Sequence, residues 1–122
     1  MRASDQHHAD ADRMLRQAVR KRVRLVTTNI ILAEVHRFAL FHFGIRPATL
    51  LLERIDASPL LRVEYVTAAH HAGGRRWLAK LSDQVITYTD AVSFAVMEAL
   101  HCTAVMSFDR DFVTAGFELW RG

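Results

Sequence analysis

The chain has 122 residues, of which 51% are apolar, and carries 16 Lys and Arg against 13 Asp and Glu. These values predict one compact domain, residues 1–122, with a sizeable core, and they argue against a second domain. No apolar run reaches the ~18 uncharged residues of a membrane span, and residues 1–17 contain no apolar segment of the kind found in signal peptides.

The cysteine content and the net charge add two indications. The single cysteine, Cys102, excludes an internal disulfide and, together with the missing signal segment, favours a cytoplasmic location. The formal net charge of +3 permits an anionic partner such as RNA without requiring one.

The first half of the chain is predicted to form a helix, a strand and two further helices, in the order 9–20, 23–28, 30–43 and 47–58. Thr28 or Asn29 can cap the second helix, and Gly44 ends it. Pro47 suits the first turn of the third helix, where a missing N–H has little effect.

In the second half, residues 60–66 are predicted to form a strand, followed by a helix that Thr67 caps. Gly73 and Gly74 count against that helix being regular. The run "VITYT" has strand character before a helix at about 91–100, and "TAVMSF" and "FELW" are predicted as the last two strands. Because strands alternate with helices, we predict an α/β fold with a parallel sheet flanked by helices on both faces.

Three acidic side chains follow three separate predicted strands. Glu34 lies about one turn into the helix after strand 23–28, Asp90 opens the helix after "VITYT", and Asp109 follows "TAVMS". Ligands of an open parallel sheet gather beyond the carboxyl ends of its strands, so the three carboxylates are predicted to face the same edge. Asp111, two residues further on, is an auxiliary candidate.

Each of these acids also has a simpler explanation. Asp90 can favour the helix macrodipole by ~0.3 to 1 kcal/mol, Glu34 can occupy the exposed face of its helix, and Asp109 can shape a turn. Spacing alone leaves both explanations open, although three acids at matching positions favour a shared site.

A shared site of this composition predicts a particular cofactor. Like charges a few ångströms apart oppose joint ionisation unless a cation neutralises them. Oxygen-only clusters suit Mg²⁺ or Mn²⁺, which can activate water and stabilise charge on a phosphoryl group. If the three acids share a site, we therefore expect Asp90 and its neighbours to be metal ligands.

Three segments resemble a known family. "TTNIILAEV", "SDQVITYTDAVSFAVMEAL" and "AVMSFDRDFVTAGFELW" are similar to the consecutive signature segments of PIN-domain ribonucleases, specifically VapC-type toxins of bacterial toxin–antitoxin pairs. The resemblance implies a parallel sheet between helices and four acids that hold Mg²⁺ or Mn²⁺ to cleave RNA. It also implies a homodimer and a cognate antitoxin that blocks the site.

The resemblance assigns roles to individual residues. It places the family's glutamate on Glu34, its helix-opening aspartate on Asp90 and its late aspartate on Asp109. Ser107 occupies a position where a hydroxyl can bond an acid or a metal-bound water, and Ser93, near Asp90, can support the same site.

The sequence departs from the family at its beginning. Family members start with a short strand that is central to the sheet and ends in the first of the four acids. This sequence has no such strand, and its opening residues "ASDQHHADADRML" resemble the segment that follows the strand in the family. Asp5 aligns with a loop position and does not replace that acid. Three explanations stay open: the protein extends upstream of Met1, the chain is a degenerate remnant, or another segment or subunit fills the gap.

Several other features have to be weighed against this site. The basic residues Arg20, Arg22 and Arg24 can be a solvated helix end or a phosphate-contacting rim beside the acids. The seven histidines lack HxxxH spacing, which indicates structural or surface positions. Cys102 is predicted to be an inert buried thiol.

Phe38, Phe41 and Phe43 are predicted to belong to the core rather than to a base-stacking platform, although in the resembling family the early helices supply dimer and antitoxin contacts.

The leading hypothesis is a metal-dependent endoribonuclease toxin. One alternative is a catalytically inactive PIN-like module that binds antitoxin or RNA without cleavage. Another is a phosphorylated response-regulator-like domain, but this needs a Lys at the end of a late strand, where the chain has Asp109 and Arg110.

Overall fold

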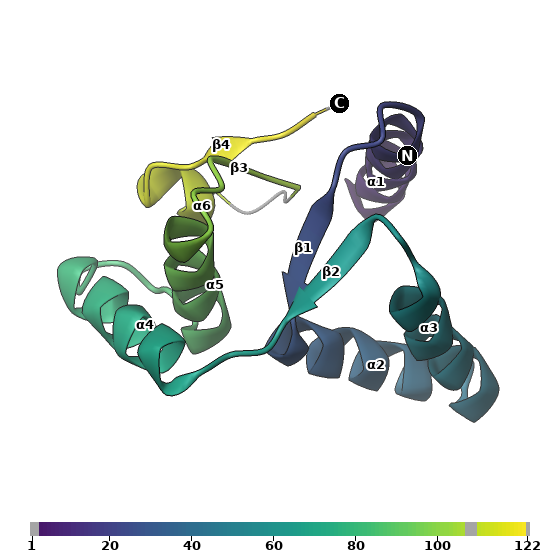
Figure 1. Ribbon diagram of the computed structural model, residues 1–122, viewed down its shortest axis with the longest axis horizontal. Coiled ribbons are helices and arrows are strands. Elements are labelled where there is room, and N and C mark those ends of the chain that lie inside the picture. Colours follow the sequence, from purple (N-terminus) through teal and green to yellow (C-terminus); the bar gives the residue numbers. More distant parts are fainter. Residues whose placement is uncertain (1–2, 107–109, 122) are drawn as a thin grey trace.

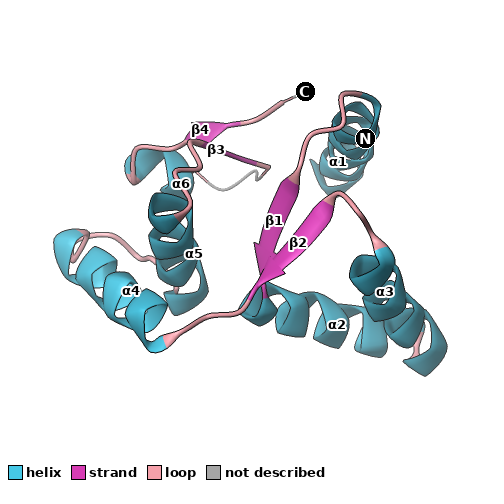
Figure 2. Cartoon of the chain, viewed as in Figure 1, coloured by secondary structure: helices cyan, strands magenta, loops and turns pink. Residues whose placement is uncertain are grey.

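The computed structural model describes residues 3–106 and 110–121, and this part of the chain forms six helices and four short strands (Figure 1, Figure 2). Their order is α1 (Ala3–Arg20), β1 (Leu25–Thr28), α2 (Asn29–Phe43), α3 (Ile45–Ala57), β2 (Leu61–Glu64), α4 (Ala68–Lys80), α5 (Tyr88–Ala99), β3 (Ala104–Val105), α6 (Asp111–Thr114) and β4 (Glu118–Leu119). None of the helices in the described residues is long and apolar enough to cross a membrane.

The strands pair in parallel, as the alternation of strands and helices predicts. β1 pairs with β2 in the register Leu25 to Leu61, and β3 pairs with β4 in the register Ala104 to Glu118. In the described part of the chain these are two separate two-stranded sheets (Figure 1). The predicted parallel pairing is therefore confirmed, but the four strands do not join into one continuous sheet.

The chain between α4 and α5 corrects one prediction. "VITYT" is not a strand: residues 81–87 connect the two helices without strand structure, and the side chain of Val85 is 97% exposed. Thr87 instead caps α5, which begins at Tyr88. Residues that favour strands form one only where a neighbouring strand supplies hydrogen-bond partners. Here the last residues of the run instead cap and begin α5.

Local capping sets the ends of α2 and α4. The Thr28 side chain accepts a hydrogen bond from the Ile31 N–H, and Gly44 ends α2 with a φ of +103°, a conformation that side chains rarely adopt. Thr67 accepts from the His70 N–H, and the His70 ring completes a capping box. The predicted caps at Thr28, Gly44 and Thr67 are confirmed.

The paired glycines of α4 mark its contact with α5. A Cβ atom on Gly73 would lie 2.8 Å from the Ala95 Cβ, and one on Gly74 would lie 2.9 Å from the Val92 Cγ2. The helix is continuous through both glycines, contrary to the prediction that they make it irregular. They allow α4 to approach α5 more closely than larger residues would permit.

The core is concentrated on this pair of helices and α6. Its buried members are Trp77, Ala91, Phe94, Ala95 and Phe112. The aromatic rings of Phe94 and Phe112 meet edge to face with centroids 5.0 Å apart. The Trp77 Nε1–H donates to the Glu98 Oε1 at 2.6 Å, which satisfies the polar atom of a nearly buried side chain. This core fixes the position of α5, the helix that carries Asp90.

The phenylalanines of α2 lie on the surface, contrary to the prediction that they belong to the core. Phe38 is 55% exposed, Phe41 70% and Phe43 68%, and the neighbouring Ile45 is 78% exposed. In Figure 1, α2 and α3 stand apart from α4 and α5, so the core on α4 and α5 does not cover them. We refer to Phe38, Phe41, Phe43 and Ile45 as the α2–α3 apolar patch.

Candidate active site

A hydrogen bond joins α2 to the first turn of α5. The Thr89 hydroxyl donates to the Glu34 Oε1 at 2.9 Å, across 55 residues of sequence. Thr89 immediately precedes Asp90, so two of the predicted acids come from helices that meet at this point. The contact fixes one oxygen of the exposed Glu34 carboxylate.

Asp90 is the third residue of α5 and is half-buried. Its backbone N–H donates to the Thr87 hydroxyl at 3.1 Å, which caps the helix. A carboxylate in the first turn interacts favourably with the helix macrodipole, so the simpler explanation of Asp90 also holds in the structure. Metal binding and capping are compatible here, because the cap uses the Asp90 backbone and not its carboxylate.

Glu34 is positioned by the carboxyl end of β1. Thr28, the last residue of β1, is buried and caps α2, so the helix begins directly at the strand end. The next residue, Asn29, accepts a hydrogen bond from the Val66 N–H through its Oδ1 at 2.8 Å. Since Val66 follows β2, this bond ties the carboxyl ends of both strands together beneath the site.

The auxiliary residues differ in their placement. The buried Ser93 donates its hydroxyl to the Thr89 carbonyl oxygen at 2.9 Å, so it supports the turn that carries Thr89 and Asp90. Asp111 is half-buried at the start of α6. Ser107 and Asp109 lie outside the described residues, so the structure does not place the third predicted acid.

The basic run lies at the opposite end of β1 from Glu34, which bears on the two alternatives that the sequence leaves open for it. Arg20 ends α1, and Arg22 and Arg24 precede β1, whereas Glu34 follows the opposite end of that strand. At 3.2–3.4 Å per residue, four steps from Arg24 to Thr28 separate the two regions by about 13 Å. The cation nearest to Glu34 on its own helix is instead Arg37, one turn later, whose guanidinium lies 5.0 Å from the centre of the Phe41 ring.

The carboxylates fit a hard divalent cation in chemistry and in number. Among the side chains that the structure describes, which leave out those of residues 1–9, 11, 12, 107–109 and 122, no group of three or more His, Cys, Asp or Glu residues gathers as a metal site. Glu34 and Asp90 lie on two helices that the Thr89–Glu34 hydrogen bond joins, and Mg²⁺ usually takes one or two carboxylates from a protein and completes its shell with waters and substrate phosphates.

Two functional candidates were not predicted from the sequence. Thr89 could have been found from its place before Asp90, where its hydroxyl can reach a facing acid. Arg37 could have been found from its spacing of three residues from Glu34, which places both on one helix face.

Comparisons with known proteins agree with the resemblance seen in the sequence. Residues 1–118 match the PIN domain family. The 23S rRNA-specific endonuclease VapC20 from two strains of Mycobacterium tuberculosis, CDC 1551 / Oshkosh and H37Rv, is 32% identical over 115 residues, which cover 94% of this chain and 85% of the relative.

A solved structure gives the same result in three dimensions. The crystal structure of Mycobacterium tuberculosis VapC20, a sarcin-ricin loop cleaving toxin, has a TM-score of 0.82 and 31% sequence identity, covering 99% of this chain and 90% of that one. The predicted family and its α/β fold are confirmed: the chain belongs to the PIN domain family.

Proposed function

We propose that the chain is a VapC-type endoribonuclease toxin that hydrolyses RNA phosphodiester bonds in the cytoplasm with the help of Mg²⁺ or Mn²⁺. The observation that carries this proposal is the Thr89–Glu34 hydrogen bond, which brings Glu34 to the helix turn of Asp90 in a chain of the PIN domain family. The two acids are far apart in sequence, and the fold joins the helices that carry them.

Each residue of the site has a defined task in this proposal. Glu34, Asp90 and Asp109 hold the cation, which when bound supplies an activated water and stabilises negative charge on the phosphate. Thr89 orients the Glu34 carboxylate by donating a hydrogen bond to one oxygen and leaving the other for the cation. Ser93 holds the turn in which Thr89 and Asp90 lie.

Ribosomal RNA is the proposed substrate class. The relative VapC20 is a 23S rRNA-specific endonuclease, and it matches nearly the whole chain. We propose that Arg37 contacts a phosphate next to the scissile bond, because it lies one turn from Glu34 and is exposed. Arg20, Arg22 and Arg24 would contact RNA farther from the reaction, at the amino end of β1.

Protein partners are assigned to the α2–α3 apolar patch. We propose that it contributes to a homodimer or to the contact with a cognate antitoxin, since four neighbouring large apolar side chains are each more than half exposed. Arg37 and His42 border the same surface, and the His42 ring stacks on Phe38 with centroids 4.0 Å apart. An acidic and apolar segment of an antitoxin would match this combination.

The alternative function is a catalytically inactive PIN-like module that binds antitoxin or RNA without cleavage. It is the second candidate because no group of three or more possible metal ligands gathers among the described side chains, which do not include Asp109. The two functions differ in whether Asp90 binds a cation, which can be measured without a substrate.

The test is thermal unfolding of the wild type and of Asp90→Asn at increasing Mn²⁺ concentration. A cation that binds only the folded protein raises the unfolding temperature as its concentration rises above the dissociation constant. The nuclease predicts a rise in the wild type that Asp90→Asn abolishes. Equal behaviour of the two proteins supports the inactive module and overturns the proposed metal site.

A further inference from the structure

A second contact joins the first turn of α5 to α4. The His71 Nδ1 and the Tyr88 hydroxyl share a hydrogen bond of 2.9 Å, and the centroids of the two rings lie 5.7 Å apart at an interplanar angle of 54°. Tyr88 is the first residue of α5, and its neighbour Thr89 donates to Glu34 on α2. The turn that carries Asp90 is therefore held by α2 through an acid and by α4 through an aromatic ring.

The Tyr88 ring is accessible as well as held. Tyr88 is 40% exposed, and its partner His71 is exposed too. The hydrogen bond engages the hydroxyl at the rim of the ring, so it orients the ring without covering its faces. Thr87 caps the helix directly before Tyr88 and fixes the backbone there. A ring held in one orientation loses little conformational entropy when a flat ligand packs on it.

A purely structural role does not account for this pair. α4 and α5 already pack closely through Gly73 and Gly74 and through the core around Trp77. A hydrogen bond between exposed side chains adds only about 1 kcal/mol to that packing. The two helices therefore do not need an exposed tyrosine to hold them together.

The ring lies next to the acids along α5. Tyr88 is two residues before Asp90, which corresponds to about 3 Å along the helix axis, and side chains two residues apart face different sides of a helix. Neighbouring nucleotides of a stacked strand are separated by a similar distance, about 3.4 Å. An RNA strand with a phosphate at Asp90 can thus place a neighbouring base on the Tyr88 ring.

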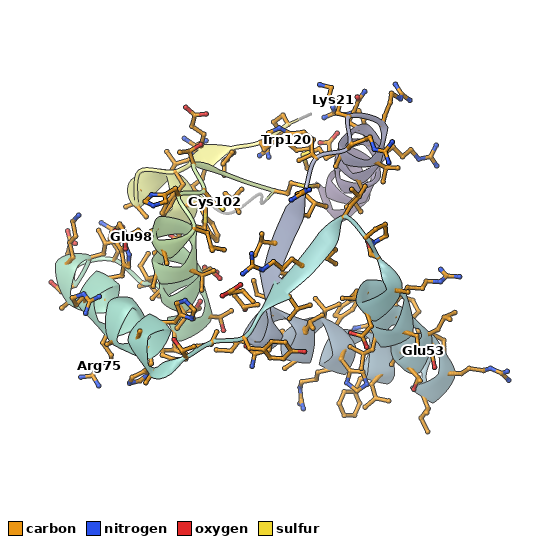
Figure 3. The ribbon with its side chains drawn as sticks, viewed as in Figure 1. Lys21, Glu53, Arg75, Glu98, Cys102 and Trp120 are labelled. Atoms are coloured by element: carbon orange, nitrogen blue, oxygen red, sulfur yellow. The ribbon has the colours of Figure 1, made fainter. Side chains whose placement is uncertain are left out.

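Arg75 adds a positive charge to the same surface. It is exposed on α4, four residues after His71, so both lie on one face of that helix (Figure 3). A guanidinium beside a stacking ring can contact the phosphate of the stacked nucleotide. This combination of an aromatic ring with a cation fits RNA better than it fits a purely apolar ligand.

We propose that Tyr88 is a base-stacking residue for the RNA substrate, and that its ring packs on the base of a nucleotide next to the scissile phosphate. His71 is a positioning residue that holds the ring. The ligand is single-stranded RNA, because a base inside a duplex does not present its face to a side chain. A purine offers a larger face than a pyrimidine, so a modest preference for a purine is expected. The inference rests on the proposed RNA substrate and deepens it, but its first test needs no cleavage.

The first experiment follows the tyrosine rings by NMR. The chain has two tyrosines, Tyr65 and Tyr88, so protein with isotope-labelled tyrosine gives two sets of ring signals, which Tyr65→Phe assigns. The ligand is a short RNA with one adenosine between uridines, added with a chelator so that it stays intact. Stacking should shift the Tyr88 ring signals upfield and leave those of Tyr65 in place. Tyr88 signals that stay unchanged up to millimolar RNA would overturn the proposal.

Variants of Tyr88 measure what the ring contributes. Tyr88→Leu should weaken binding of this RNA at least about tenfold, a difference of about 1.4 kcal/mol. Tyr88→Trp keeps a stacking surface and should bind within about threefold of the wild type. The matched control is Tyr65→Leu, because Tyr65 is 67% exposed and follows β2; its effect should stay below about twofold. Equal losses in the two Leu variants would contradict the proposal.

The role of His71 is tested through its partner. His71→Ala should weaken RNA binding about threefold, and His71→Asn, which keeps a polar atom near the place of Nδ1, should restore it. In a Tyr88→Phe background the hydroxyl is already missing, so His71→Ala should have no further effect. Additive losses would show that His71 acts on the RNA by itself and would overturn its positioning role.

Cleavage kinetics separate this inference from the proposed function. Tyr88→Leu should raise KM about tenfold with kcat nearly unchanged, because the ring binds substrate and transition state alike, whereas Asp90→Asn should lower kcat. RNA binding through Tyr88 without any cleavage would overturn the nuclease and keep the inference. Asp90-dependent cleavage with an unchanged KM in Tyr88→Leu would keep the nuclease and overturn the inference.

Two further outcomes are decisive. Tyr88 ring signals that respond to a synthetic acidic and apolar peptide but not to RNA would assign the surface to a protein partner and overturn the proposal. If Tyr88→Leu fails to fold, an RNA with an abasic residue in place of the adenosine tests the same contact on the wild type. It should bind about tenfold more weakly than the intact RNA, and equal binding would contradict the stacking role.

Discussion

Glu34 accepts a hydrogen bond from Thr89 at 2.9 Å, and this single contact joins the helix that follows β1 to the helix that carries Asp90. Both partners lie on well-anchored elements. α2 is capped by the buried Thr28, and α5 is held by the core around Trp77 and Phe94. The backbone positions of Glu34 and Asp90 are therefore set by the packing of two helices.

The charge of Glu34 is expected to matter more than its hydrogen bond. Glu34→Gln keeps an oxygen that can accept from Thr89 but removes the negative charge, so RNA cleavage should fall at least about 100-fold with the unfolding temperature unchanged. The control is Glu53→Gln on α3, whose side chain is exposed and labelled in Figure 3. Cleavage at wild-type rates by Glu34→Gln would remove Glu34 from the proposed site.

Thr89 is expected to act through Glu34. Thr89→Val deletes the hydroxyl that orients the carboxylate, and Mn²⁺ affinity measured by calorimetry should fall about tenfold, as for other residues that position metal ligands. Thr89→Ser keeps the hydroxyl and should restore the affinity. Stability should change by less than about 1 kcal/mol, because the bond is exposed to solvent. Equal losses in the Val and Ser variants would show that the hydroxyl is irrelevant.

The salt dependence of RNA binding distinguishes Arg37 from an ordinary surface cation. If Arg37 contacts a phosphate, Arg37→Gln should reduce the slope of log affinity against log salt concentration by about 0.7 to 0.9. Arg54→Gln on α3 provides the comparison, since Arg54 is exposed in the last turn of that helix. The slopes would be measured by filter binding on the metal-free protein, and an unchanged slope for Arg37→Gln would exclude the contact.

The close approach of α4 and α5 predicts a coupled pair of stability effects. Gly73→Ala places a Cβ 2.8 Å from the Ala95 Cβ, and the overpacking should outweigh the better helix propensity, giving a net loss of about 1 kcal/mol in urea unfolding. Combining it with Ala95→Gly removes the clashing atom. The two changes should therefore be non-additive by about 1 kcal/mol, and strict additivity would mean that the helices separate at no cost.

Local signals predicted the helix ends well. Thr28, Thr67 and Gly44 act within one turn of their own helices, so a short window of sequence contains all the information needed. Ser93 and Asp90 were placed on the correct helix for the same reason. The family resemblance rested on these same segments, and the comparisons confirm it.

Features that depend on distant partners were predicted less well. Nothing near Gly73 in the sequence shows that Ala95 will lie against it, and the apolar residues around Val85 do not reveal that a neighbouring strand is absent there. The exposure of Phe41 has the same origin, because apolar periodicity predicts a helix face but not whether another element covers it. Arg24 is near Glu34 along the chain, but β1 lies between them, so the two residues lie at opposite ends of that strand.

Cleavage of ribosomal RNA tests the central claim most directly. The wild type and Asp90→Asn would be incubated with intact ribosomes and with total cellular RNA, with Mg²⁺, with Mn²⁺ and with a chelator, after circular dichroism has shown that both proteins are folded. The account predicts cleavage that requires both the cation and Asp90. A folded wild type that binds RNA but leaves it intact under every condition would contradict the nuclease and support the inactive binding module.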